Sequence, residues 1–84
     1  MWIEYKSQIR TKMTPMRPRL SSLQLAWLNK QAEFGRNVWV IVLTDDGHFI
    51  LKKQDDWDRG IAPGAVGLSN YRKVAAEITQ EIHE

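Results

Sequence analysis

The sequence predicts an α/β fold with the element order β-α-β-β-α around a small mixed sheet. An amphipathic helical pattern separates a short N-terminal strand from a continuous apolar run at 38–43. A turn at 44–47 then leads into another strand, and a second amphipathic pattern closes the chain. Strand, helix, strand implies a parallel crossover, whereas strand, turn, strand implies a hairpin. We therefore expect one parallel pair and one antiparallel pair, packed by two helices.

The first strand is the run Trp2-Ile3-Glu4-Tyr5-Lys6. Successive side chains of a β-strand point to opposite faces, so Glu4 and Lys6 share one face while Ile3 and Tyr5 share the other. A carboxylate and an ammonium group on one surface suit a metal site beside a group that positions water. The same pattern is also that of an ordinary half-buried strand.

The first helix has a sharp start signal at Leu20-Ser21-Ser22-Leu23-Gln24. Ser21 can accept from the backbone amide of Gln24 while the Gln24 side chain reaches back to the amide of Ser21, which is a capping box. Leu25, Leu28 and Ala32 follow at helical spacing and predict one broad buried side. We expect the helix to run to Phe34 and to stop at Gly35, a residue suited to a left-handed C-terminal cap.

The remaining elements follow from residue type and period. The β-branched run at 37–43 is typical of a central strand that is covered on both faces, and residues 48–52 return antiparallel after the turn. Residues 54–68 are rich in Asp, Gly and Pro and predict an irregular connection, after which a helix begins at Ser69 or Asn70. Among the aromatic and histidine side chains we expect Trp27 and Trp39 in the core, Trp57 at an interface and His48 in solvent.

Composition limits the chemistry. The 84 residues fit one domain, 1–84, whose core is small enough that partner subunits are expected. The chain has no cysteine and only two separated histidines, which excludes disulfides and thiolate or histidine-rich zinc sites. A metal ion would need oxygen ligands, as magnesium, manganese or calcium do, but the acids around Trp57 lack the spacing of a calcium loop. No apolar stretch has the length of a membrane span or resembles a signal peptide, so we expect a cytoplasmic protein.

Charge is distributed unevenly along the chain, although its net value is only +2. Seven of the basic residues and two of the acids lie at or before Arg36, so the first part is basic and the rest is acidic. Residues 7–19 contain two prolines and no hydrophobic period, and read as a basic loop that leaves directly from the first strand. Its cationic side chains would either neutralise nucleic-acid phosphates or simply be solvated: Arg10, Lys12, Arg17 and Arg19.

The order of the E-x-K strand, the basic loop, the S-x-x-Q helix start and the apolar strand resembles the PD-(D/E)XK nuclease superfamily, most closely its virus-type replication-repair nuclease (VRR-NUC) branch. Residues 2–43 carry the resemblance. It implies a truncated restriction-endonuclease-like core, a Mg2+ (or Mn2+) ion bound by Glu4 and the backbone carbonyl of Tyr5, a water oriented by Lys6, and Gln24 lining the site. It also implies structured or branched DNA as substrate. A nuclease-like domain this compact would suit a phage.

The family pattern also requires an aspartate on a strand before the E-x-K strand, and only three residues precede Glu4. Either a downstream acid such as Asp45 or Asp46 replaces it, a partner chain supplies it, or the site is not catalytic. A reading frame that continues upstream of Met1 would be a further source. Without the outer strands the first strand is an open edge, which predicts a homo-oligomer or a partner chain that supplies strand and carboxylate.

Three functions therefore remain open from the sequence. The first is a magnesium-dependent endonuclease, which Glu4 and Lys6 beside a basic loop favour. The second is a nuclease-derived module that binds DNA without cleaving it. The third is a protein-interaction domain that uses its open edge strand.

Overall fold

The computed structural model describes residues 1–9, 15–62 and 65–83. Within them the chain forms a small α/β domain with three strands and three helices. In chain order these are β1 (Trp2–Ser7), α1 (Ser22–Glu33), β2 (Val38–Thr44), β3 (Gly47–Leu51), α2 (Gln54–Arg59) and α3 (Tyr71–His83).

The three strands form one mixed sheet in the order β1-β2-β3. β1 runs parallel to β2, with Glu4 opposite Val40 and Lys6 opposite Val42, and β3 returns antiparallel to β2. The predicted parallel crossover and the predicted hairpin are both confirmed. β2 is the central strand and is buried on both faces, as its β-branched run predicts.

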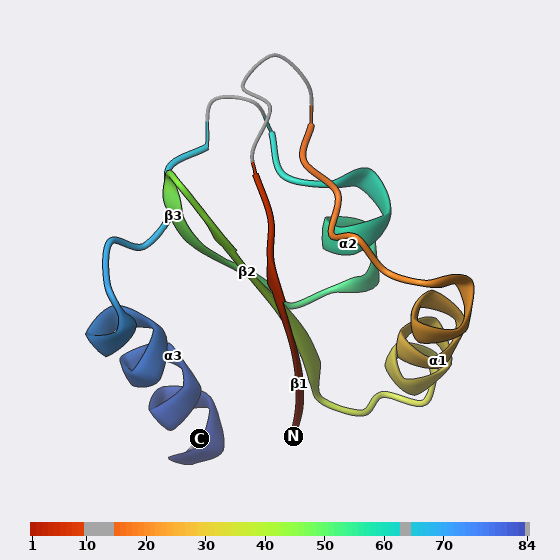
Figure 1. Cartoon of the computed structure of the whole chain (residues 1–84). Coiled ribbons are helices and arrows are strands. Elements are labelled where there is room, and N and C mark those ends of the chain that lie inside the picture. Colours follow the sequence, from red (N-terminus) through yellow and green to blue (C-terminus); the bar gives the residue numbers. More distant parts are fainter. Residues whose placement is uncertain (10–14, 63–64, 84) are drawn as a thin grey trace.

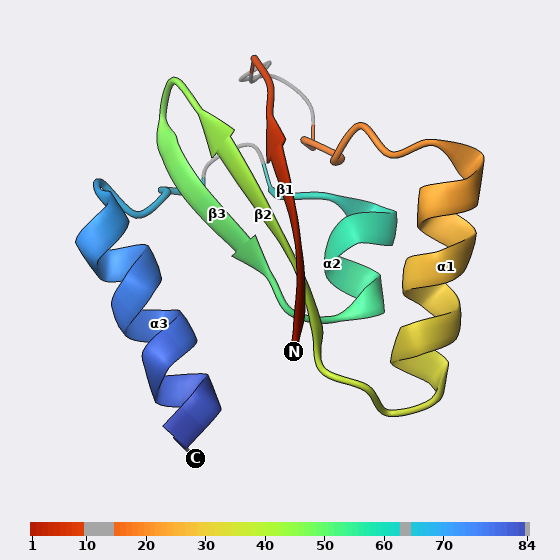
Figure 2. The same cartoon turned by 60° about the horizontal axis from the view of Figure 1, so that its bottom comes forward.

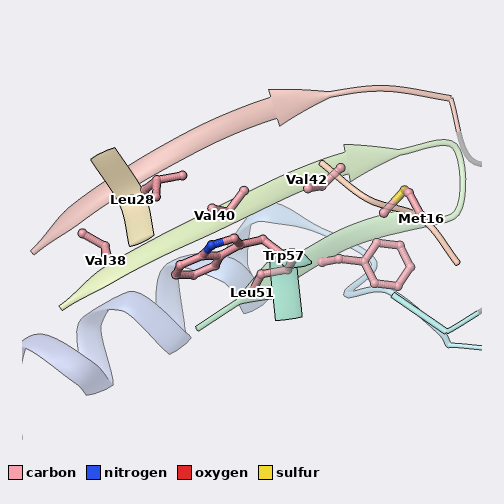
Figure 3. Close-up of a cluster of buried hydrophobic side chains, with 8 residues drawn as sticks. Met16, Leu28, Val38, Val40, Val42, Leu51 and Trp57 are labelled. Atoms are coloured by element: carbon pink, nitrogen blue, oxygen red, sulfur yellow. The ribbon is translucent and has the colours of Figure 1, made fainter. Parts of the chain in front are cut away.

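Helices cover both faces of the sheet. α1 and α2 lie on one side and α3 lies on the other (Figure 1), and the view from below shows the same separation (Figure 2). The alternating residues of β2 divide the apolar side chains between the two layers. Val38, Val40 and Val42 point to the α1 and α2 side, where they meet Leu28 of α1 and Trp57 of α2 (Figure 3).

Both ends of α1 are set by local chemistry. The Ser21 hydroxyl accepts from the Gln24 amide at 3.1 Å, and the Gln24 side chain accepts from the Ser21 amide at 3.0 Å. The predicted capping box is therefore confirmed. At the other end Gly35 has φ +72, its amide bonds to the carbonyl of Ala32, and the Arg36 amide bonds to that of Gln31. These two bonds form a Schellman motif, which explains why the helix stops at the glycine.

The prediction of an irregular connection at 54–68 is wrong for its first part, which contains the helix α2. The carboxylate of Asp56 accepts from the backbone amides of Lys52 and Lys53 at 3.1 and 3.2 Å and so satisfies donors at the helix start. The positive charge of Arg59 in the last turn interacts favourably with the negative end of the helix dipole. The helix is short, so its apolar period is too brief to stand out in the sequence.

Three side chains lie in a different environment from the one predicted. Trp57 is buried in the core, where its indole N–H donates to Asn29 Oδ1 at 2.8 Å, and is not at an interface. Trp27, expected in the core, is 41% exposed, whereas Trp39 is buried as predicted. His48 is buried and not solvated, because a bridge between His48 and Leu68 and the ring of Tyr71 cover it.

Candidate functional site

Glu4 and Lys6 lie on the face of β1 that looks toward α1. Their side chains are separated by 3.6 Å between Glu4 Oε1 and Lys6 Nζ, and each is a little over one-fifth exposed. Alternation along the strand places them together, as the sequence predicts. The pair is thus a partly desolvated acid and base with access to solvent.

Gln24, in the first turn of α1, contacts both members of this pair. Its Nε2 donates to Glu4 Oε1 at 3.3 Å, and its Oε1 accepts from Lys6 Nζ at 3.2 Å. The orientation of the amide follows from the cap, because the oxygen must face the Ser21 N–H, which leaves the NH2 group for Glu4. The capping box therefore fixes the position of Gln24 as well as the start of the helix.

The carboxylate of Glu4 lines a groove of about 300 Å³ between β1 and α1. Its other oxygen, Oε2, accepts from the indole N–H of Trp2 at 3.4 Å. The ring of Trp2 meets that of Trp27 edge to face, with 5.0 Å between centroids. The groove is lined by Trp2, Glu4, Leu23, Gln24, Trp27 and Leu28. It is an apolar hollow with one carboxylate and one amide in its wall.

The backbone of β1 offers a further oxygen at the open edge of the sheet. The amides of Trp2 and Gln8 donate to Asn37 and Leu43 of the β2 segment, each at 3.0 Å. Peptide groups alternate in direction along a strand, so the N–H and C=O groups of Ile3, Tyr5 and Ser7 point away from β2. The Tyr5 carbonyl is consequently directed outward at the edge next to Glu4.

Carboxylate and carbonyl oxygens are the ligands that Mg2+ and Mn2+ prefer, so the donor types of Glu4 and Tyr5 fit such an ion. The described residues contain no cluster of three His, Cys, Asp or Glu side chains that could hold a metal. Asp45 does not supply the second carboxylate. Glu4 pairs with Val40, and Asp45 follows Val40 by five residues, about 16 Å at a rise of about 3.3 Å per residue. Asp46 lies one residue further along the same turn.

The predicted nucleic-acid-binding residues are only partly within the described structure. Arg10 and Lys12 lie outside the described residues. Arg17 and Arg19 are exposed, on a segment that Gln8 holds against the end of β1. Gln8 Nε2 donates to the Arg17 carbonyl at 2.8 Å, and Gln8 Oε1 accepts from the Arg19 amide at 2.9 Å. Both arginines are therefore attached to the strand that carries Glu4 and Lys6.

Sequence reasoning missed two residues that fix this segment. Gln8 is one, and Met16 is the other: it is buried in the core and bridges to Ile61, with backbone bonds of 2.9 and 2.7 Å. A single apolar residue between two prolines carries no period, and Ile9 and Met13 in the same stretch give the sequence no way to single out Met16.

The opposite face of β1 carries a second polar contact. The Tyr5 hydroxyl donates to the Tyr71 hydroxyl of α3 at 3.4 Å. Burial, the hydrogen bond to Tyr71 and the charge that Tyr71 acquires on ionising together raise the pKa of Tyr5 from 10.0 to about 12. Tyr5 thus remains a neutral hydroxyl throughout the neutral pH range.

A scan of protein-family models, a search of curated proteins and a search of solved structures each found no match to this chain. Among the helices of the described residues, none combines the length and the apolar character needed to cross a membrane.

Proposed function

We propose that this chain is a divalent-metal-dependent endonuclease that hydrolyses phosphodiester bonds in structured or branched DNA, with a carboxylate from a second chain completing its site. The observation that supports this most directly is the convergence of Glu4, Lys6 and Gln24 at one groove beside the open edge of the sheet. On this proposal the strand-helix-strand unit from β1 to β2 corresponds to part of a restriction-endonuclease-like core.

Each residue has a distinct role in the proposed reaction. Glu4 and the Tyr5 carbonyl would hold Mg2+ or Mn2+, which when bound polarises a phosphoryl oxygen and makes a neighbouring water acidic. Lys6 places a positive charge where negative charge develops on the phosphate and orients the attacking water. Gln24 is a positioning residue, because it holds both Glu4 and Lys6 through its amide.

Two alternatives have their own support. Arg17 and Arg19 are exposed beside β1, which favours a module that binds DNA through phosphates without cleaving it. The outward peptide groups of β1 favour a protein-interaction domain that accepts a strand.

Cleavage assays with matched variants test the proposal. The purified chain and the variants Glu4→Gln and Lys6→Met are incubated with junction, flap and single-stranded DNA in Mg2+ or Mn2+. Glu77→Gln and Lys52→Met serve as controls, because Glu77 and Lys52 form an ion pair of 3.0 Å outside the site. We expect Glu4→Gln and Lys6→Met to abolish cleavage, while both control variants cut as the natural chain does.

Two other outcomes would contradict the proposed nuclease activity. Equal cleavage by Glu4→Gln would show that the activity does not come from this site. If no protein cuts any substrate in either metal, the enzyme reading fails: salt-sensitive DNA binding would then support the binding module, and the absence of binding would support the interaction domain.

A further inference from the structure

The outer edge of β1 is open. In the order β1-β2-β3 no other described strand pairs with it, and Figure 1 shows β1 in front of the other two strands with the helices to either side. The outward N–H and C=O groups of Ile3, Tyr5 and Ser7 are therefore available to another strand. The six residues of β1 contain no proline, and no bulge interrupts their register with β2.

Aromatic side chains flank this edge on both faces of the sheet. Trp2 is 50% exposed beside Trp27 on one face, and Tyr5 is 44% exposed beside Tyr71 on the other. Large half-exposed rings on both sides of an unpaired strand would be covered by the side chains of an added strand, which alternate between the same two faces.

We infer that the occupant is a second copy of this chain, whose β1 pairs antiparallel with the first about a two-fold axis at Tyr5. A two-fold axis perpendicular to the sheet makes the strands antiparallel and keeps both α1 helices on the same face. The ladder requires the outward residues Ile3, Tyr5 and Ser7 to face outward residues of the other copy. Odd-numbered residues of one β1 therefore face odd-numbered residues of the other, and even-numbered residues face even-numbered ones.

Charge selects between the two registers with the longest overlap. Centring the axis on Glu4 pairs residues 2–6 with 6–2 and sets Glu4 directly against Glu4 of the second copy. Centring it on Tyr5 pairs residues 3–7 with 7–3 and sets Glu4 against Lys6 of the second copy, twice by symmetry. Opposite charges stabilise a cross-strand pair and like charges destabilise it, so the Tyr5 register is favoured. Further shifts by two residues shorten the overlap.

This register also brings two carboxylates together. Glu4 and Glu4 of the second copy become diagonal neighbours on the α1 face, with Cα atoms about 7–8 Å apart. Glutamate side chains can span that separation toward one Mg2+ or Mn2+ ion. In the dimer the second Glu4 carboxylate then takes the place of the Tyr5 carbonyl, which accepts from the facing Tyr5 amide in the ladder. The dimer follows from the edge and its charges alone, whereas this shared metal site rests on the proposed function.

Charge reversal tests the dimer. Glu4→Lys sets lysine against Lys6 of the second copy, and Lys6→Glu sets glutamate against Glu4. We expect each variant to raise the dissociation constant of the dimer about tenfold or more, measured by sedimentation equilibrium. An equimolar mixture of the two restores opposite charges at every pair and should form heterodimers. Recovery on mixing cannot come from misfolding, and circular dichroism checks each variant alone.

A backbone variant gives an independent test. The Ser7 amide points outward, so Ser7→Pro removes a donor from the proposed interface without removing a bond to β2. We expect it to be monomeric with an unchanged β-sheet signal. A natural chain that sediments as a monomer at all concentrations, or single charge variants that dimerise as well as the natural chain, would overturn the inference.

Metal binding and cleavage separate the two proposals. Mn2+ binding, followed by electron paramagnetic resonance, should appear in the dimer and be lost in Ser7→Pro. A dimer that neither binds Mn2+ nor cuts DNA would refute the nuclease and leave the dimer standing. A monomer that cuts DNA would refute the dimer and the carboxylate from a second chain, but would leave the endonuclease activity of the Glu4 site standing.

Discussion

The Gln24 side chain has two structural roles, because one amide both caps α1 and contacts the acid and base of β1. Replacing it by glutamate keeps an acceptor for the Ser21 amide and places a second carboxylate beside Glu4. We expect the melting temperature of Gln24→Glu to rise when Mn2+ or Mg2+ is added. A ligand at one hundred times its dissociation constant stabilises the folded state by about 2.7 kcal/mol.

Gln31→Glu is the matched control for that variant. It makes the same change on the same helix, but Gln31 contacts Arg36 at 2.7 Å and not Glu4. Thermal unfolding with and without metal compares the two. If Gln24→Glu responds to metal no more than Gln31→Glu, Glu4 is not one half of a metal site.

Tyr5 provides a prediction of pH dependence. Tyr71→Phe keeps the ring that packs on His48 but removes the hydroxyl contact and the charge that contribute to the raised pKa. The contribution of burial, which is the largest, remains. The pKa of Tyr5 should therefore fall from about 12 toward 10.0 without reaching it. Since Tyr5 is then the remaining tyrosine, its tyrosinate absorbance reports the pKa directly.

The sign of the stability effect follows from the raised pKa. Below pH 10 both folded and unfolded states keep the proton, and the stabilisation is fully present. Between pH 10 and about 12 the unfolded state loses its proton first, so stability falls as pH rises. This alkaline loss should be smaller in Tyr71→Phe. An unchanged Tyr5 pKa in the variant would assign the whole shift to burial.

At the scale of single residues, the sequence predicted which side chains share a face of one strand better than it predicted which side chains of different elements touch. Strand alternation alone puts Glu4 and Lys6 on one face. The contact of Gln24 with both depends on where the start of α1 lies above β1, and that is set by Gln8 and Met16 in a stretch without period. The predicted environments of Trp57 and His48 were wrong for a related reason, since both side chains are buried by segments distant in the chain.

At the scale of elements, the start of α1 offers the clearest test of a sequence signal. Ser21→Ala removes the acceptor for the Gln24 amide and should lower the free energy of unfolding by about 1 kcal/mol, within a range of about 0.5–2 kcal/mol. Ser22→Ala is the control, because Ser22 is exposed at the first helical position and alanine favours a helix. Urea unfolding measures both. Equal losses would mean that the cap contributes no specific stability.

The elements differ in how much of them the sequence reveals. The capping box and the glycine stop of α1 were confirmed. Its apolar side is narrower than predicted, because Leu28 is buried, Leu25 and Ala32 are partly buried against the core, and Leu23 and Trp27 are exposed. The apolar run of β2 predicted burial on both faces correctly. α2 was missed because its start depends on the Asp56 carboxylate accepting from two lysine amides. The neighbouring Asp55 and Asp58 make that signal hard to distinguish from a turn.

At the scale of the molecule, Trp57 joins the two helices on one face of the sheet. It is buried against β2 and its indole N–H bonds to Asn29 of α1. Trp57→Ala should cost about 3–5 kcal/mol, a large part of the roughly 5–15 kcal/mol that stabilises a domain. Trp57→Phe keeps most of the ring and should cost less. Chemical denaturation followed by circular dichroism compares them, and equal costs would show that the indole N–H, and not the buried ring, dominates.

On the proposal that the chain acts on DNA, the charges of the described residues predict which side of the molecule DNA would contact. Arg17 and Arg19 are held beside β1, whereas Arg72 and Lys73 are exposed on α3, on the other face of the sheet (Figure 2). If the arginines contact phosphates, replacing both by glutamine reduces the slope of log affinity against log salt by about 0.9 per contact for duplex DNA. Arg72→Gln with Lys73→Gln changes the net charge equally and should leave the slope almost unchanged. Fluorescence anisotropy across a salt series measures it. Equal slopes for the two double variants would place the DNA elsewhere, or show that only net charge attracts it.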